Sequence, residues 1–106
     1  MLAGSILAAK KGQQIVILDL RKLTIIADYF VIATGTSEVH VRALAKELIE
    51  QLKGHGVRPG SAQGVQDGHW ALVDLGDVII HVFMEFERGF YALERLWADA
   101  PRIEVA

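Results

Sequence analysis

Two short groups of residues have types and spacing that could carry chemistry. Gly35-Thr36-Ser37 lies between an apolar stretch and a helical pattern, where backbone N–H groups can hold a phosphate or a serine can act as a nucleophile. A phosphate loop would also need a lysine, and a nucleophile elbow a second glycine, but Glu38 and Val39 follow instead. We therefore expect Thr36 or Ser37 to cap the helix.

Asp74 and Asp77 form the second group, and paired carboxylates can bind a metal or share proton transfer. They flank a predicted turn, where aspartate commonly forms local hydrogen bonds. The four histidines do not have the spacing of a metal site; they are His40, His55, His69 and His81. From the residues alone we predict a binding module rather than an enzyme, with no metal and no cofactor.

The amino-acid composition limits the classes of protein to which this chain can belong. The chain has 106 residues, of which 52% are hydrophobic and 23% charged, so we expect one folded domain over residues 1–106. The sequence contains no cysteine, which excludes a disulfide scaffold, a thiolate zinc site and a cysteine nucleophile. No apolar run reaches the roughly 20 residues of a membrane span, and Lys10 and Lys11 follow the first apolar stretch, unlike a signal peptide. We expect a cytoplasmic protein.

The charge is uneven along the chain. The net charge is −2, but residues 1–66 carry +3 and residues 67–106 carry −5. A nucleic-acid-binding element usually has a basic excess, whereas this acidic half would suit a basic partner. On composition alone, however, a solvated acidic surface without a partner is the favoured explanation.

Hydrophobic periodicity predicts a single mixed β-sheet with flanking helices, an α/β (α+β) fold. The clearest helix has an apolar stripe and ends near Gly54. Residues 85–98 are predicted to form one amphipathic helix with Phe86, Phe90, Leu93 and Trp97 on one face. The predicted elements are a short helix at 2–11 ended by Gly12, strands at 14–20 and 28–34, a helix at 37–53, an ambiguous edge strand within 57–64, and strands at 69–75 and 77–84.

The last two strands predict a binding face. A turn at Leu75-Gly76 would place Leu72 opposite Ile79 and Trp70 opposite His81. One face is then wholly aliphatic and belongs under the helices: Ala71, Val73, Val78, Ile80, Val82 and Met84. The other mixes aromatic, aliphatic and polar residues, as protein interfaces do: Trp70, Leu72, Asp74, Ile79, His81 and Phe83. A helix or terminal segment of the same chain covering this face is the alternative.

Two stretches resemble the signatures of one family. The first is DYFVIATGTS at residues 28–37, followed by His40-Val41-Arg42-Ala43. The second begins at Trp70, includes Gly76-Asp77-Val78, and ends in YALERLW at residues 91–97. Together they resemble the ribosomal silencing factors, also called RsfS or Iojap-like proteins. The amino-terminal helix is shorter here than is usual in that family.

The resemblance implies a fold and a function. It implies a nucleotidyltransferase-like fold without the catalytic carboxylates, since Asp74-x-x-Asp77 lacks the D-x-D spacing of those enzymes. It implies binding to the large ribosomal subunit through ribosomal protein fourteen, which blocks subunit joining and represses translation in starvation or stationary phase. A homodimeric adaptor with another protein target is the alternative. Combined with the hairpin pattern, it assigns the partner contact to Trp70, Leu72, Asp74, His81 and Phe83, with Tyr91 and Glu94 as neighbours.

Overall fold

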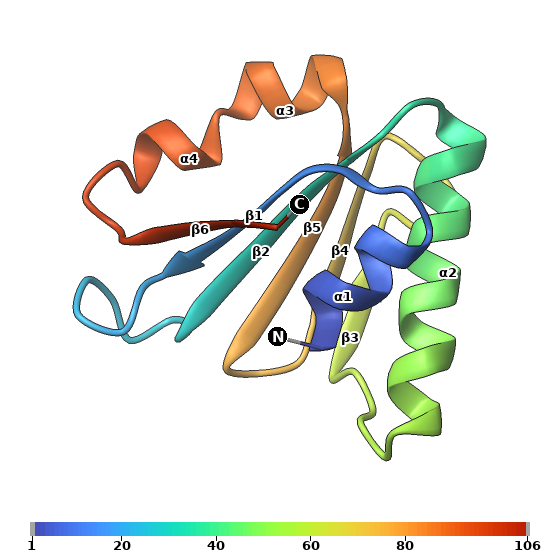
Figure 1. Ribbon diagram of the computed structural model, residues 1–106, viewed down its shortest axis with the longest axis horizontal. Coiled ribbons are helices and arrows are strands. Elements are labelled where there is room, and N and C mark those ends of the chain that lie inside the picture. Colours follow the sequence, from blue (N-terminus) through green and yellow to red (C-terminus); the bar gives the residue numbers. More distant parts are fainter. Residues whose placement is uncertain (1, 106) are drawn as a thin grey trace.

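The computed structural model describes residues 2–105 and contains a six-stranded mixed sheet within that range. Figure 1 shows helices α1 and α2 on one side of the sheet and α3 and α4 on the other. The strands lie in the order β3-β4-β5-β2-β1-β6. The helices are α1 (Leu2–Ala9), α2 (Glu38–Gly54), α3 (Glu85–Tyr91) and α4 (Leu93–Leu96), and the strands are β1 (Gln13–Asp19), β2 (Tyr29–Gly35), β3 (Ser61–Gln63), β4 (Trp70–Asp74), β5 (Val78–Met84) and β6 (Arg102–Val105).

The predicted α+β class and mixed sheet are confirmed. β2 and β5 pair in parallel at the centre of the sheet, and the remaining neighbouring strands pair antiparallel. The ambiguous segment contains the edge strand β3. The strand β6 was not predicted, because residues 102–105 are too few and too polar to show a clear strand pattern. The first helix ends at Ala9, and Lys11 rather than Gly12 takes the left-handed conformation.

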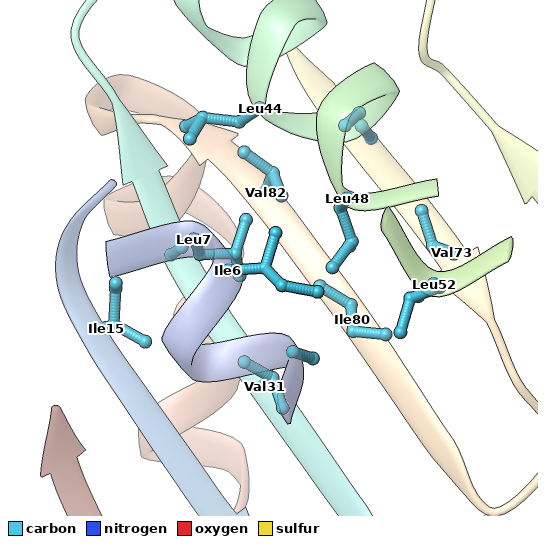
Figure 2. Close-up of a cluster of buried hydrophobic side chains, with 14 of the residues drawn as sticks. Ile6, Leu7, Ile15, Val31, Leu44, Leu48, Leu52, Val73, Ile80 and Val82 are labelled. Carbon is cyan, nitrogen blue, oxygen red and sulfur yellow. The ribbon is translucent and has the colours of Figure 1, made fainter. Parts of the chain in front are cut away.

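Central strands are covered on both faces, so their side chains alternate between two apolar cores. Figure 2 shows the first core, where side chains of α1 and α2 meet those of the sheet. Val31 and Ala33 of β2 point into this core, while Phe30 and Ile32 point into the second. Leu93 and Trp97 pack against the second core from the side of α3 and α4.

The N-cap of helix α2 fixes where the helix begins, and its apolar stripe fixes which side faces the sheet. Ser37 is the N-cap, and its Oγ accepts the backbone N–H of His40 at 3.1 Å. This confirms the predicted capping role of the Gly35-Thr36-Ser37 segment. The apolar stripe of the helix is buried against the sheet and comprises Val41, Leu44, Ala45, Leu48 and Leu52.

Candidate protein interface

The β4–β5 hairpin presents the two predicted faces, but its register differs from the expected one. Trp70 pairs with Phe83 and Leu72 pairs with His81. The predicted pairing is therefore wrong by two residues. The two-residue turn is Gly76-Asp77, closed by the Leu75 N–H donating to the Val78 carbonyl at 2.9 Å, and Gly76 has a φ of 96°. A shift of two residues keeps every side chain on its face because the strand period is two.

Trp70 lies half-buried at the centre of a group of aromatic rings. Its indole N–H donates to Nδ1 of His81 at 3.1 Å. The Trp70 ring centroid lies 4.9 Å from that of Phe83 and 4.5 Å from that of Tyr91. The indole is thus fixed in position while part of it remains accessible to another molecule.

His81 and Phe83 lie beneath this surface. Only 4% of His81 and 1% of Phe83 is exposed. Burial lowers the pKa of His81 to about 4, so its imidazole is neutral at physiological pH. Because Nδ1 accepts the indole N–H, the ring proton is on Nε2. Both residues therefore support Trp70 from within the fold, while Leu72 and Asp74 are half-buried further along β4 on the same face.

Tyr91 and Glu94 have different positions although they are close in sequence. Tyr91 is 47% exposed and lies against Trp70. The half-buried Glu94 is fixed by its own chain, because both its carboxylate oxygens accept hydrogen bonds from the buried Arg88 at 3.0 Å. The hydrogen bond from Arg88 lowers the pKa of Glu94, with help from Arg102. Arg88 also donates to Thr34 of β2 at 2.8 Å, so this network holds α3 and α4 on the sheet.

The single amphipathic helix predicted at residues 85–98 is wrong. The chain breaks at Ala92, which has a φ of 47°, and α3 and α4 lie on either side of it. Leu93 and Trp97 pack on the core, but Phe86 and Phe90 are 74% and 71% exposed. The broken axis explains why residues with helical spacing do not share a face.

Exposed rings on α3 extend the surface beyond the predicted residues. The Phe86 and Phe90 rings lie 6.0 Å apart, and the Phe90 and Tyr91 rings 5.1 Å apart. Together with Trp70 they form an aromatic patch, the name used below for Trp70, Phe86, Phe90 and Tyr91. The sequence signal for it was a pair of phenylalanines four residues apart within an acidic segment.

Several of the residues considered for chemistry have structural partners. An Asp74 carboxylate oxygen accepts the Gly76 N–H at 2.8 Å, which is the predicted role in the turn. His40 accepts the Thr36 N–H through Nδ1 at 2.9 Å, and its Nε2 lies 3.2 Å from the Lys10 carbonyl, joining α2 to the end of α1. Within residues 2–105 no group of three histidine, aspartate or glutamate side chains is arranged to hold a metal ion.

An open cleft of about 890 Å³ lies between the β1–β6 edge and the helices α3 and α4. It carries arginine and glutamate side chains in equal number, so its charge favours neither an anion nor a cation. These charged side chains are Glu85, Arg88, Glu94, Arg95, Arg102 and Glu104. No helix in the described part of the chain is both long and apolar enough to cross a bilayer.

Comparison with known proteins identifies the family. The family model described as "Ribosomal silencing factor during starvation" matches residues 2–106. This chain belongs to the ribosomal silencing factor family. The chain is 43% identical over 96 residues to the ribosomal silencing factor RsfS of Halalkalibacterium halodurans, a match covering 91% of this chain and 82% of the relative. It is 42% identical over 92 residues to the RsfS of Bacillus subtilis, covering 87% and 78%.

Solved structures and distant relatives agree with membership of the RsfS family. A crystal structure of a Chromobacterium violaceum protein superposes with a TM-score of 0.89 at 40% identity, covering 92% of this chain and 81% of that one. A mouse protein named "Mitochondrial assembly of ribosomal large subunit protein 1" is 30% identical over 96 residues. The match covers 88% of this chain but 42% of the mouse protein. The resemblance noted from the two sequence signatures is confirmed.

Proposed function

We propose that this RsfS-family chain binds the large ribosomal subunit through ribosomal protein fourteen and prevents the small subunit from joining. Translation is then repressed in starvation or stationary phase, and the chain acts in the cytoplasm, where ribosomes translate. Family membership supports the ribosomal target. The observation that carries the choice of surface is the half-buried Trp70, held by His81 and flanked by the exposed Tyr91.

The aromatic patch has the composition of a protein-binding surface. Tryptophan and tyrosine dominate the energetics of protein interfaces because they bury a large area with few rotatable bonds. Trp70 and Tyr91 would make the direct contacts, with Leu72 and Asp74 beside them. His81 and Phe83 would contribute from beneath, by fixing the indole, and Glu94 by fixing α4.

The net charge of this part of the chain also supports the choice of surface. Residues 67–106, which include β4, β5, α3 and α4, carry a net charge of −5. An acidic surface of this kind would attract a basic ribosomal partner and increase the rate of encounter. The association should therefore weaken as ionic strength rises.

The mechanism that we propose has no chemical step. A factor bound where the small subunit must dock excludes that subunit by occupying the space. Repression then depends on the affinity and concentration of the factor rather than on turnover. Such a role needs a rigid, preformed surface, and the fixed indole provides one.

Sedimentation of purified subunits with the protein tests this proposal. We expect the wild-type chain to sediment with large subunits, not with small subunits, and to reduce the yield of joined ribosomes when added before mixing. Sedimentation with small subunits alone, or unchanged joining at saturating protein, would contradict it. Pull-down with isolated ribosomal protein fourteen then identifies the contact within the large subunit.

A homodimer formed through the same surface is the second candidate. The exposed Phe86 and Phe90 side chains, whose rings lie 6.0 Å apart, favour it, because isolated monomers rarely leave large apolar side chains together in water. Light scattering separates the two proposals. A dimer that dissociates when ribosomal protein fourteen is added shares the surface, whereas a dimer that persists in the complex uses another one.

A further inference from the structure

Strand β6 leaves one side of its backbone without a neighbouring strand. It stands at the end of the strand order and pairs with β1 alone among the strands that the structure describes. An open strand edge presents N–H and C=O groups that can pair with another strand. The outer edge of β6 is therefore a place where a strand of a second molecule can extend the sheet.

The hydrogen bonds to β1 decide which residues of β6 face this open edge. The Asp19 N–H donates to the Pro101 carbonyl at 2.9 Å, immediately before the strand. Hydrogen-bonded positions alternate along an antiparallel ladder, so the backbone groups of Ile103 also point at β1. The N–H and C=O groups of Arg102 and Glu104 then point to the open edge. Pro101, which has no N–H, costs that edge no donor because its backbone faces β1.

The two outward-facing residues carry opposite charges, and the residue between them is apolar. Ile103 lies opposite Ile17 on the face that α1 covers, yet 62% of Ile103 is exposed. Arg102 and Glu104 share the other face of the strand, and both are exposed. Arg102 contacts Glu94 at 3.2 Å, but about half of its side chain remains accessible. All three side chains of β6 are thus available to another molecule.

This short pattern is complementary to itself in the antiparallel orientation. When a second copy of β6 runs beside the first, the outward-facing positions must pair with one another, since they alone have free backbone groups. Pairing Arg102 with Glu104 of the second copy sets opposite charges side by side in both halves of the contact. The shifted registers pair Arg102 with Arg102 or Glu104 with Glu104, and like charges directly opposite each other destabilise a sheet. Backbone direction and charge together select one register.

The selected register places Ile103 on the two-fold axis. Ile103 then faces its own copy in a non-hydrogen-bonded pair, where the side chains of opposite residues come closest. Its exposed apolar surface is covered by the same residue of the second copy. A contact in which the same patch serves both molecules closes at two copies. The chain itself therefore supplies the charges and the apolar side chain that its own edge requires.

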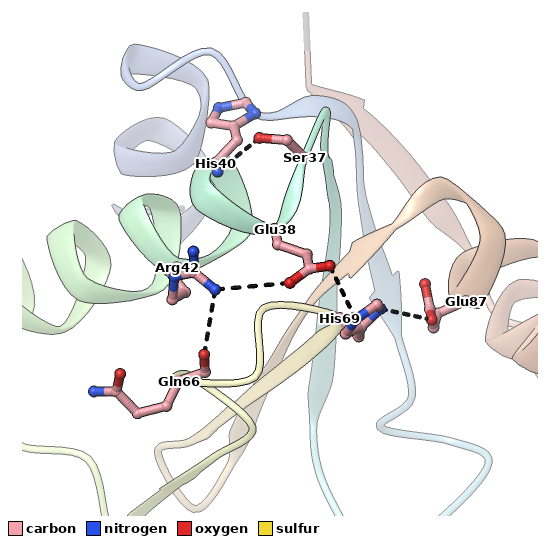
Figure 3. Close-up of polar contacts among 7 residues, drawn as sticks. All are labelled: Ser37, Glu38, His40, Arg42, Gln66, His69 and Glu87. Atoms are coloured by element: carbon pink, nitrogen blue, oxygen red, sulfur yellow. Dashed lines mark hydrogen bonds and ion pairs between the residues drawn. The ribbon is translucent and has the colours of Figure 1, made fainter.

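The opposite edge of the sheet is formed by β3 and lacks these features. β3 is only three residues long (Ser61–Gln63) and carries no charge that would select a register. The loop between β3 and β4 uses its polar groups within the chain, as Figure 3 shows. Arg42 of α2 donates to the Gln66 carbonyl at 3.4 Å, and the His69 Nδ1 lies 3.1 Å from a Glu87 oxygen of α3. The self-complementary edge is therefore that of β6.

We propose that two copies of this chain join through β6 into one continuous sheet, with Arg102 opposite Glu104 and Ile103 opposite Ile103. A contact between two four-residue strands is smaller than a typical stable interface, which buries about 1,200–2,000 Å². The dimer is therefore weak and forms as the protein concentration rises. Strands β5, β2 and β1 separate β6 from β4, which carries Trp70, so the dimer leaves Trp70 accessible in both copies. Self-association through β6 thus does not depend on the proposed ribosomal function.

A single cysteine on the axis tests the register directly. The chain contains no cysteine, so a disulfide in Ile103→Cys joins position 103 of two copies. Opposite Cα atoms in a non-hydrogen-bonded pair are about 4.5 Å apart, within the roughly 4.4–6.8 Å that a disulfide spans. We expect Ile103→Cys to form a linked dimer about ten-fold or more faster than Ile26→Cys, the matched control, which is 68% exposed in the loop before β2. Equal rates of linkage would overturn the proposal.

Sedimentation velocity measures the association itself. For the wild-type chain, studied from about 10 μM to about 1 mM, we expect the average mass to rise with concentration. Ile103→Lys should stay monomeric, because it sets two positive charges on the axis. Since Ile103 is largely exposed, this substitution removes no core contact. A wild-type chain that stays monomeric throughout, or a dimer that Ile103→Lys leaves intact, would contradict pairing through β6.

Charge exchange tests the pairing of Arg102 with Glu104. Glu104→Arg alone and Arg102→Glu alone each place like charges across the contact, so each should weaken self-association about five- to thirty-fold. An equal mixture of the two variants restores opposite charges at both positions and should associate about as strongly as wild type. A mixture of folded variants that associates no better than either one alone would rule out this register. Arg102 also contacts Glu94, so if Arg102→Glu fails to fold, the cysteine variants decide alone.

Discussion

The Trp70 indole N–H donates to Nδ1 of His81 across the β4–β5 hairpin, at 3.1 Å. This bond joins the half-buried indole at the centre of the aromatic patch to a buried imidazole whose other nitrogen, Nε2, has no partner within residues 2–105. The histidine can serve as the acceptor only while it is neutral. The orientation of Trp70 and the protonation state of His81 are therefore coupled.

Acid should destabilise the fold through His81. Burial holds its folded-state pKa at about 4, below the ordinary 6.5, so the unfolded chain takes up a proton first as pH falls. The stability lost through this group between pH 6.5 and pH 4 is about 3 kcal/mol. Below pH 4 both states are protonated and the loss levels off.

Denaturant unfolding of wild type and His81→Gln checks this prediction. The glutamine does not titrate, and its amide oxygen can still accept the indole N–H. The variant should lose less stability than wild type between neutral pH and pH 4. The carboxylates are the same in both proteins, so their effect cancels when the two losses are subtracted. Equal pH slopes for the two proteins would show that His81 is not held neutral by burial.

Removing the Glu94 carboxylate should destabilise the fold far more than removing its exposed ionic partner Arg102. Glu94→Ala would leave the buried Arg88 guanidinium with Thr34 as its remaining partner, at a cost of about 3 kcal/mol. Arg102→Ala removes an exposed contact to the same carboxylate and should cost less than about 1 kcal/mol. Thermal unfolding of the two variants measures the contrast. Similar losses of stability in the two variants would mean that other groups neutralise the Arg88 guanidinium when Glu94 is absent.

Stability should also depend on pH through Glu94. Its folded-state pKa is lowered, first by the hydrogen bond from Arg88, so the ion pair contributes stability at neutral pH that is lost as pH falls through the acidic range. Arg88→Met should remove this contribution. An acid-unfolding profile of Arg88→Met that keeps the wild-type slope would contradict the pairing.

Two glycines with positive φ should respond differently to alanine. Gly64 has a φ of 72°, and a Cβ there would overlap the Trp70 carbonyl oxygen, so Gly64→Ala should cost more than about 2 kcal/mol. Gly76 has a φ of 96° with open space around it, so Gly76→Ala should cost about 1–2 kcal/mol. Equilibrium unfolding gives both values. The reverse order would show that the backbone beside Trp70 adapts easily.

The sequence predicted features that depend on local pattern. Ile80 and Val82 alternate with Ile79 and Phe83, and this alternation assigned the two faces of the hairpin although its turn was misplaced. The cap at Ser37 was predictable because capping involves residues only three apart. Membership of the RsfS family was predictable because the second signature combines many residues in a fixed order.

The features that the sequence did not predict depend on contacts between residues far apart in the chain, which no local pattern encodes. Arg88 and Thr34 are 54 residues apart, and only the folded sheet brings them together. Ala92 breaks the final helix in a conformation that alanine rarely adopts, because Arg88, Glu94 and the core contact of Leu93 fix the chain on both sides. The exposure of Phe86 and Phe90 follows from that break, so the helical pattern alone misplaced them.

The affinity of Trp70 and Tyr91 variants for ribosomal protein fourteen tests the central claim most directly. Trp70→Ala and Tyr91→Ala, each shown to be folded, should weaken binding by about 2 kcal/mol or more, while Ile103→Ala on the exposed face of the distant strand β6 should not. Wild-type affinity in both folded variants would show that the aromatic patch is not the surface that contacts the ribosome.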